Sequence, residues 1–149
     1  MVNIRFIATL LFIGMLQLIL IPPATAREIF IAGDSTASVY GPERYPRMGW
    51  GQVLGDFYPE EVRVIDLAQS GRSARSFIDE GFFADLESQL GADDILLIQF
   101  AHNDQKIHSP ERYAAPDTTF KEYLGKYISL ARDKGAQAVL LTPVVRRKF

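Results

Sequence analysis

The fold is decided by the stretch Ile95–Asp104, ILLIQFAHND, in which a nearly continuous apolar run ends abruptly in polar residues. A strand that helices cover on both faces has this composition, whereas a strand with one solvated face alternates apolar and polar residues. The run at 138–142, AVLLT, has the same character and is stopped by Pro143. Two strands of this kind predict a parallel sheet with helices on both faces.

Further strands and helices are expected around these two runs. Residues 28–32 and 62–67 are rich in apolar and β-branched residues, as strands are. Helices are expected at 49–58 and at 78–90, where Gly91 ends the helix although Gly81 weakens its start. With a helix before the last strand, strands and helices alternate along the chain. This order predicts one α/β domain built on a doubly wound parallel sheet.

The helix before the last strand has the clearest periodic signal. Its apolar residues recur at helical spacing and form one stripe. They are Phe120, Tyr123, Leu124, Tyr127, Ile128 and Ala131. Thr119 and Glu122 predict a capping box at its start, and Gly135 predicts its end.

Residues 1–26 have the composition of a signal peptide. A short cationic start precedes an apolar run, and Ala24-Thr25-Ala26 supplies the small residues that a signal peptidase reads. A membrane anchor that is not cleaved and a buried helix are the alternatives, but the run is shorter than the roughly 20 apolar residues of a spanning helix. We therefore expect a secreted protein, periplasmic or extracellular, that meets a membrane only if this segment stays attached.

Charge and composition exclude several classes of function. Arg5 is the only one of the 16 basic residues in the leader, which holds none of the 18 acidic ones, so 15 basic and 18 acidic residues remain, a net charge of −3. This mild charge gives no reason to expect nucleic acid as a partner. The chain has no cysteine, which excludes disulfides and a thiol nucleophile. Neither histidine has metal-ligand company, so we expect no metal or other cofactor.

Residues 33–38, GDSTAS, follow the first expected strand. A strand that turns through glycine into a serine can place the hydroxyl at a helix N-terminus, where backbone N–H groups face a reacting centre. Ser35 is therefore a candidate nucleophile, although serine needs a base as well. The simpler interpretation is that one of these residues caps the following helix.

Two more unusual loops follow the second and third strands. In residues 69–76, QSGRSARS, Gly71 allows a backbone N–H to point into a site, and the alternatives are a tight turn or an anion nest. In the third loop the Asn103 amide could donate to a developing oxyanion, although Asn and Asp also simply form turns. Sites of open parallel sheets lie at the carboxyl ends of the strands, where all three loops are expected.

Together the loops resemble the signature blocks of the SGNH (GDSL-like) hydrolases, and the match is closest to the rhamnogalacturonan acetylesterase branch. The motifs are Gly33–Thr36, Ala68–Ser76, His102–Lys106 and Thr142–Arg147. The resemblance implies a flavodoxin-like sheet and the removal of acetyl groups from pectic polysaccharide, chiefly rhamnogalacturonan. It implies that Ser35 attacks the acetyl carbonyl, and that the N–H groups of Ser35 and Gly71 with the Asn103 amide form the oxyanion hole. Asp34, His102 and Asp104 are expected to support this site.

The sequence departs from this family in two places. Ala101 stands where the family has glycine, which could alter the backbone before Asn103. The family's Asp-x-x-His block, which carries the catalytic base, is absent from the 149 residues. We therefore expect residues 27–149 to be the N-terminal portion of an SGNH hydrolase domain, truncated after the fourth strand and inactive alone. His102 is expected to be structural and His108 solvated.

Substrate contacts and competing functions stay open. Arg72 and Arg75 could meet uronate carboxylates, or could lie on a solvated helix face. Trp50, Tyr40 and Tyr45 could stack on sugars, although packing is the simpler expectation. A non-catalytic remnant or a sugar-binding pseudoenzyme is the alternative function. Phosphate binding is less favoured, because the nucleotide motifs G-x-x-x-x-G-K-[ST] and G-x-G-x-x-G are absent. The oligomeric state is not predicted.

Overall fold

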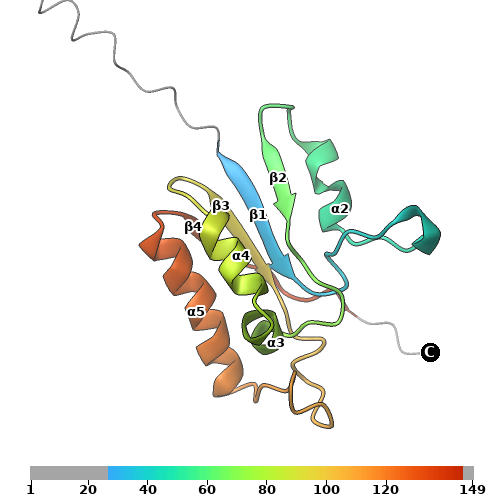
Figure 1. Cartoon of the computed structure of the whole chain (residues 1–149), viewed down its shortest axis with the longest axis vertical. Coiled ribbons are helices and arrows are strands. Elements are labelled where there is room, and N and C mark those ends of the chain that lie inside the picture. Colours follow the sequence, from blue (N-terminus) through green and yellow to red (C-terminus); the bar gives the residue numbers. More distant parts are fainter. Residues whose placement is uncertain (1–26, 146–149) are drawn as a thin grey trace, which may run out of the picture.

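Four parallel strands form the sheet of the computed structural model, which describes residues 27–145 (Figure 1). The strands are β1 (Glu28–Gly33), β2 (Arg63–Asp66), β3 (Ile95–Gln99) and β4 (Gln137–Leu140). Their order is β2-β1-β3-β4, and every pairing is parallel. This is the first part of the flavodoxin-like order. The fold class expected from the sequence is confirmed.

Helices cover both faces of the sheet. On one face lie α3 (Ala74–Asp79), α4 (Phe82–Gln89) and α5 (Thr119–Asp133), while α2 (Gly51–Leu54) and the 3₁₀ turn η3 (Gly55–Phe57) lie on the other (Figure 1). Strand β1 serves both layers, since side chains alternate along a strand. Phe30 belongs to the larger core under α3, α4 and α5, and Ile31 to the smaller core under α2.

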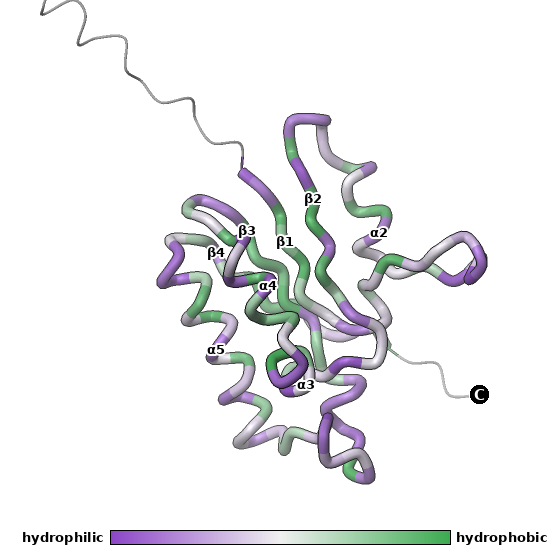
Figure 2. The backbone as a smooth tube through the Cα atoms, in the orientation of Figure 1, coloured by the Kyte–Doolittle hydropathy of each residue, from purple (hydrophilic) through white to green (hydrophobic). Residues whose placement is uncertain are grey.

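The hydropathy of the backbone follows these layers (Figure 2). The inner strands β1 and β3 are largely apolar, and the loops are mostly polar. In the larger core the Tyr127 ring lies 5.4 Å from Phe100 and 6.1 Å from Phe77, measured between centroids. The buried Tyr127 hydroxyl donates to the Ala74 carbonyl at 2.9 Å. The core therefore holds the start of α3 against α5.

Three details of the expected helices were wrong. The helix expected at 78–90 begins only at Phe82, as α4, because Gly81 adopts a left-handed φ of +94° that separates it from α3, to which Ile78 and Asp79 belong. The helix expected at 49–58 is α-helical only over Gly51–Leu54 and then tightens into η3.

The capping box expected at the start of α5 is also absent. The N-cap is Thr118 and makes no side-chain cap, while the Thr119 hydroxyl instead accepts from the Ala115 N–H at 2.8 Å. A capping box does occur at the start of α3, where Ser73 and Ser76 satisfy each other's backbone N–H groups.

The expected signal peptide, residues 1–26, lies outside the described part of the chain, as do residues 146–149. Across residues 27–145 the structure contains no helix with the length and hydropathy needed to cross a bilayer.

Candidate active site

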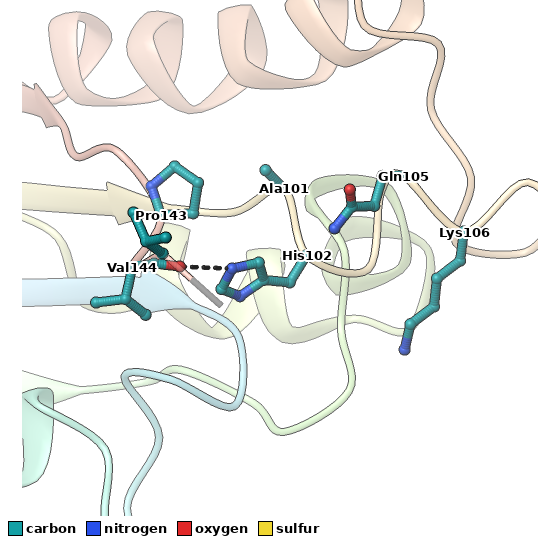
Figure 3. Close-up of a pocket in the computed structure, with 7 residues that line it drawn as sticks. Ala101, His102, Gln105, Lys106, Pro143 and Val144 are labelled. Carbon is teal, nitrogen blue, oxygen red and sulfur yellow. Dashed lines mark hydrogen bonds between the residues drawn. The ribbon is translucent and has the colours of Figure 1, made fainter. Parts of the chain in front are cut away.

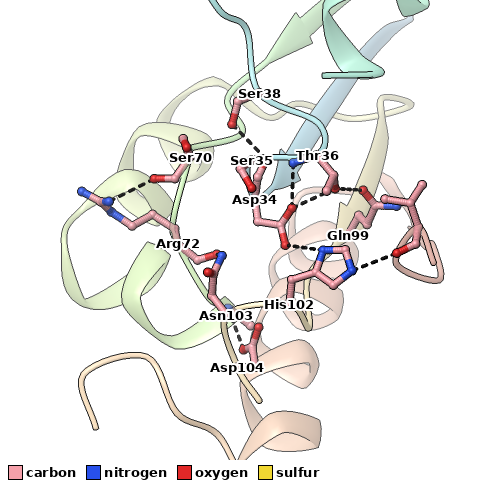
Figure 4. A network of polar contacts seen from close by, with 12 residues as sticks. Asp34, Ser35, Thr36, Ser38, Ser70, Arg72, Gln99, His102, Asn103 and Asp104 are labelled. Atoms are coloured by element: carbon pink, nitrogen blue, oxygen red, sulfur yellow. Dashed lines mark hydrogen bonds and ion pairs between the residues drawn. The ribbon is translucent and has the colours of Figure 1, made fainter. Parts of the chain in front are cut away.

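The three unusual loops converge at the carboxyl ends of the strands (Figure 4). The Tyr40 hydroxyl donates to the Ser35 carbonyl at 2.8 Å and lies 3.4 Å from the Ser70 hydroxyl, which connects the first and second loops. The Asn103 amide donates to the Arg72 carbonyl at 2.8 Å and connects the third loop to the second. The three loops therefore lie next to one another at the carboxyl edge of the sheet.

Ser35 lies at the apex of a turn that Asp34 organises. The Asp34 carbonyl accepts from the N–H groups of Ala37 and Ser38, both at 3.1 Å. Its carboxylate Oδ1 accepts from the Thr36 N–H at 2.9 Å and lies 2.8 Å from the Thr36 hydroxyl. Asp34 is buried, whereas Ser35 is half-buried. Oδ1 of the Asp34 carboxylate therefore stabilises the turn, while Ser35 keeps part of its surface exposed to solvent.

Each donor of the predicted oxyanion hole has an N–H group without an acceptor in the described part of the chain. Among the hydrogen bonds of residues 27–145, no acceptor is assigned to the backbone N–H of Ser35 or of Gly71. Gly71 has a φ of +83°, and the space where a Cβ would lie is open. Asn103 gives one of its two amide N–H groups to Arg72, and no described residue accepts the other. Their convergence on one oxyanion stays a prediction.

The orientation of the Asn103 amide is determined by its neighbours. Its Oδ1 accepts from the Lys106 ammonium at 2.7 Å, and its Nδ2 donates to the Arg72 carbonyl. An ammonium can only donate and a carbonyl can only accept, so the flipped amide would lose both hydrogen bonds. Asn103 is buried, which strengthens this constraint.

The polar contacts of His102 in the described structure are with residues other than Ser35. Its buried ring lies with Nε2 2.9 Å from the Val144 carbonyl and Nδ1 3.6 Å from Asp34 Oδ2 (Figure 4). A carbonyl only accepts, so Nε2 carries a proton and donates to it. The ring also borders a pocket of about 660 Å³ between the third loop and the segment after β4, with Lys106 and Pro143 in its wall (Figure 3). The other histidine, His108, is exposed.

Asp104 connects the third loop to helix α3. Its Oδ1 accepts from the Ala74 N–H at 2.9 Å, and no described residue binds its buried Oδ2. Burial raises the pKa of this carboxyl to about 6, and the hydrogen bond from Ala74 opposes the shift. The carboxyl is therefore a buried group with a raised pKa that joins two segments of the chain.

Ala101 adopts a backbone conformation that favours glycine. Its φ is +146°, the only positive φ among the non-glycine residues of the described chain besides that of Asp93. The departure from the family's glycine therefore falls at a strained position, directly before His102 and Asn103.

The two arginines expected to meet substrate are paired within the chain. The Arg72 guanidinium lies 2.6 Å from a Glu80 oxygen. The Arg75 guanidinium lies 3.1 Å from an Asp79 oxygen and donates to the Pro110 carbonyl at 2.8 Å. Their contact with substrate stays a prediction. Within residues 27–145 no group of three histidine or acidic side chains is arranged to hold a metal.

Sequence reasoning missed the role of Gln99, the last residue of β3. Its Oε1 lies 2.9 Å from the Thr36 hydroxyl and accepts from the Trp50 indole at 2.6 Å. Its Nε2 donates to the Thr142 carbonyl at 2.9 Å. Gln99 thus holds the Ser35 turn, the α2 side and the exit of β4 together. The signal for this role was one amide in an otherwise apolar strand.

Fold and loops together define the class: an α/β protein in which a half-buried serine follows the first strand, beside two loops that carry amide donors. The chain belongs to the GDSL-like lipase/acylhydrolase family, whose model matches residues 29–147. It is 46% identical over 121 residues to the probable rhamnogalacturonan acetylesterase YesY of Bacillus subtilis. It is 43% identical over 122 residues to the rhamnogalacturonan acetylesterase RhgT of the same organism.

These matches cover most of this chain and part of each relative. They span 81% and 82% of this chain but 55% of YesY and 51% of RhgT, so the chain spans about half the length of these relatives. The solved structure of the Bacillus subtilis protein YxiM superposes with a TM-score of 0.71 at 30% identity. That match covers 81% of this chain and 34% of the YxiM chain.

Proposed function

We propose that this chain carries the nucleophile and oxyanion hole of a serine esterase that removes O-acetyl groups from pectic polysaccharide, with rhamnogalacturonan as the substrate. The observation that carries the proposal is the half-buried Ser35 at a turn beside two loops, in which the Gly71 N–H and one of the two Asn103 amide N–H groups have no acceptor within residues 27–145. The names of the two rhamnogalacturonan acetylesterase relatives support the choice of substrate.

The proposed chemistry has two steps. The Ser35 oxygen attacks the acetyl carbonyl while a base takes its proton, and the carbonyl oxygen becomes an oxyanion. The N–H groups of Ser35 and Gly71 and the Asn103 amide stabilise that charge. The sugar hydroxyl leaves with the proton, and water then hydrolyses the acetyl-serine to acetate.

The base is the part of this scheme that the described residues do not supply. His102 is buried and its Nε2 donates to the Val144 carbonyl, while its Nδ1 lies 3.6 Å from Asp34; His108 is exposed. We propose that residues 27–149 form the N-terminal portion of the domain and are inactive alone. The base would come from a segment bearing the family's Asp-x-x-His block. Loss of one member of such a triad lowers the rate by several orders of magnitude.

Turnover of p-nitrophenyl acetate tests these proposals. The chain alone should show negligible turnover, and fusion to the C-terminal half of RhgT should restore it. In the fusion, Ser35→Ala should abolish turnover and Asn103→Ala should reduce it by about 10²–10³-fold. Ser88→Ala, on the exposed side of α4, is the matched control and should have no effect.

Three outcomes would contradict the proposals. Burst acylation by the chain alone would show that the base is present. Turnover by the Ser35→Ala fusion would exclude Ser35 as nucleophile. An inactive fusion that still binds acetylated rhamnogalacturonan would favour the alternative, a sugar-binding remnant.

We also propose that residues 1–26 direct the protein out of the cytoplasm and are cleaved before Arg27. N-terminal sequencing of the protein recovered from an expressing bacterial host tests this, and a mature protein that still begins at Met1 would contradict it.

A further inference from the structure

A second pocket lies beside the candidate active site, at the carboxyl end of β2. Its volume is about 370 Å³, within the range of small-ligand sites. One wall is the arm at 38–47, which contains the 3₁₀ turn η2 (Pro42–Arg44) and projects from the body of the molecule (Figure 1). The other wall is the end of β2 and the second loop, including Gln69 and Ser70.

This pocket is joined directly to the Ser35 turn. Tyr40 lines the pocket, and its hydroxyl donates to the Ser35 carbonyl at 2.8 Å. The same hydroxyl lies 3.4 Å from Ser70, on the opposite wall. A ligand seated in the pocket would therefore lie next to the residue that carries the nucleophile.

The pocket contains one cation that has no acidic partner in residues 27–145. The Arg47 guanidinium lies 4.5 Å from the centre of the Tyr40 ring and makes no ion pair with any described side chain. Arg44 also lines the pocket, but its guanidinium lies 3.9 Å from the Glu43 carboxylate. Arg72 and Arg75, the cations expected to meet substrate, are both paired elsewhere. Among the described residues that line the pocket, Arg47 is therefore the guanidinium without an ion-pair partner.

The acidic residues of the pocket leave Arg47 available. Asp66 Oδ1 accepts from the Ala68 N–H at 2.9 Å. Its Oδ2 is buried, and a Cβ added to Gly51 would lie 2.5 Å from it, so this oxygen faces α2. Glu43 is largely exposed beside Arg44. Neither carboxylate forms an ion pair with Arg47.

We propose that this pocket is a subsite for a uronate residue of the polysaccharide, with Arg47 binding the carboxylate. This inference rests on the proposed function, whose substrate contains galacturonate. A guanidinium matches a carboxylate with two parallel hydrogen bonds, and the ring behind it limits its movement. The hydroxyl and amide groups of Ser70 and Gln69 supply partners for sugar hydroxyls. Tyr45, 82% exposed on the same arm, offers a flat ring to the adjoining sugar.

Binding of two matched ligands to the whole chain tests the subsite. Trigalacturonate carries free carboxylates, and its methyl ester has the same rings without the charge. Isothermal titration should show roughly tenfold tighter binding of the acid, the gain expected for one charge-assisted pair. Arg47→Gln should remove this preference, and Arg47→Lys should keep part of it. Arg132→Gln, an exposed cation on α5, is the control for net charge and should keep all of it.

Equal affinity of the wild-type chain for acid and ester would overturn the proposal, as would no measurable binding of either. A preference retained by Arg47→Gln would also overturn it, provided circular dichroism shows that the variant is folded. Turnover by the RhgT fusion separates this test from that of the proposed function. A preference without turnover leaves the subsite standing while the esterase proposal fails, and turnover without a preference does the reverse.

Discussion

Replacing Ala101 by glycine should stabilise the protein, although glycine usually destabilises it. At its φ of +146°, an alanine side chain crowds the backbone, at a cost of roughly 1–3 kcal/mol. Glycine would remove this cost but lose about 0.5–1 kcal/mol through the greater freedom of the unfolded chain. It would also lose less than about 0.8 kcal/mol from burial of the methyl group, which is only half-buried.

The balance is a net gain of about 1 kcal/mol in the free energy of unfolding. For a domain of this size that corresponds to a rise of about 4 °C in Tm. Urea unfolding followed by circular dichroism measures the change, with an unchanged m-value showing that only stability has altered.

The matched control is Ala115→Gly, a half-buried loop alanine whose φ is not positive. The free energy of unfolding of this variant should fall by about 1 kcal/mol, because glycine raises the conformational entropy of the unfolded chain and no backbone strain is relieved. If Ala101→Gly destabilises the protein as much as Ala115→Gly does, the backbone at Ala101 is not strained.

Two further variants test the site's electrostatics and backbone. The Asp104 carboxyl has a pKa of about 6 in the folded protein against 3.8 when exposed, so the folded state binds its proton more tightly than the unfolded state does. The resulting contribution to the free energy of unfolding is fully present below about pH 3.8 and is lost as the pH rises to about 6. Between pH 4 and 7 the wild-type free energy of unfolding should therefore fall by about 2 kcal/mol, as measured by urea unfolding. Asp104→Asn, whose amide oxygen can still accept from the Ala74 N–H, should remove this dependence on pH. An unchanged pH profile would show that Asp104 is not the group that titrates. Gly71→Ala should cost about 1–2 kcal/mol through its φ of +83° alone, because the added methyl meets open space. Gly125 lies inside α5 with equally open space around it, so Gly125→Ala should instead raise the free energy of unfolding by about 1 kcal/mol. Equal effects of the two variants would show that the positive φ of Gly71 carries no cost for alanine.

The positions of the strands could be predicted from the sequence because their signal is local. The apolar runs at 95–100 and 138–142 contain β3 and most of β4, although β3 ends one residue and β4 two residues before the run does. The boundaries of the helices were harder. Gly81 was recognised as a weakness, but only the folded backbone shows that its left-handed φ divides the segment into α3 and α4.

The side-chain pairs of the site could be predicted only in part. Arg75 and Asp79 are one helical turn apart, so their ion pair was open to prediction. Arg72 precedes α3 and Glu80 follows its last residue, so their ion pair depends on how the second loop packs against this helix. The contact of Tyr40 with Ser35 likewise depends on how the arm folds back. Such pairs are set by tertiary packing, which neither periodicity nor motif spacing encodes.

The hydrogen bond between Trp50 and Gln99 gives the protein a built-in optical reporter. Trp50 is the chain's single tryptophan, so its emission has one source. Its indole shares the Gln99 oxygen with Thr36, the residue after Ser35. Any event that shifts the serine turn, such as acylation or the seating of a sugar, should therefore alter this emission. The kinetics of such events can then be followed by stopped flow on unlabelled protein.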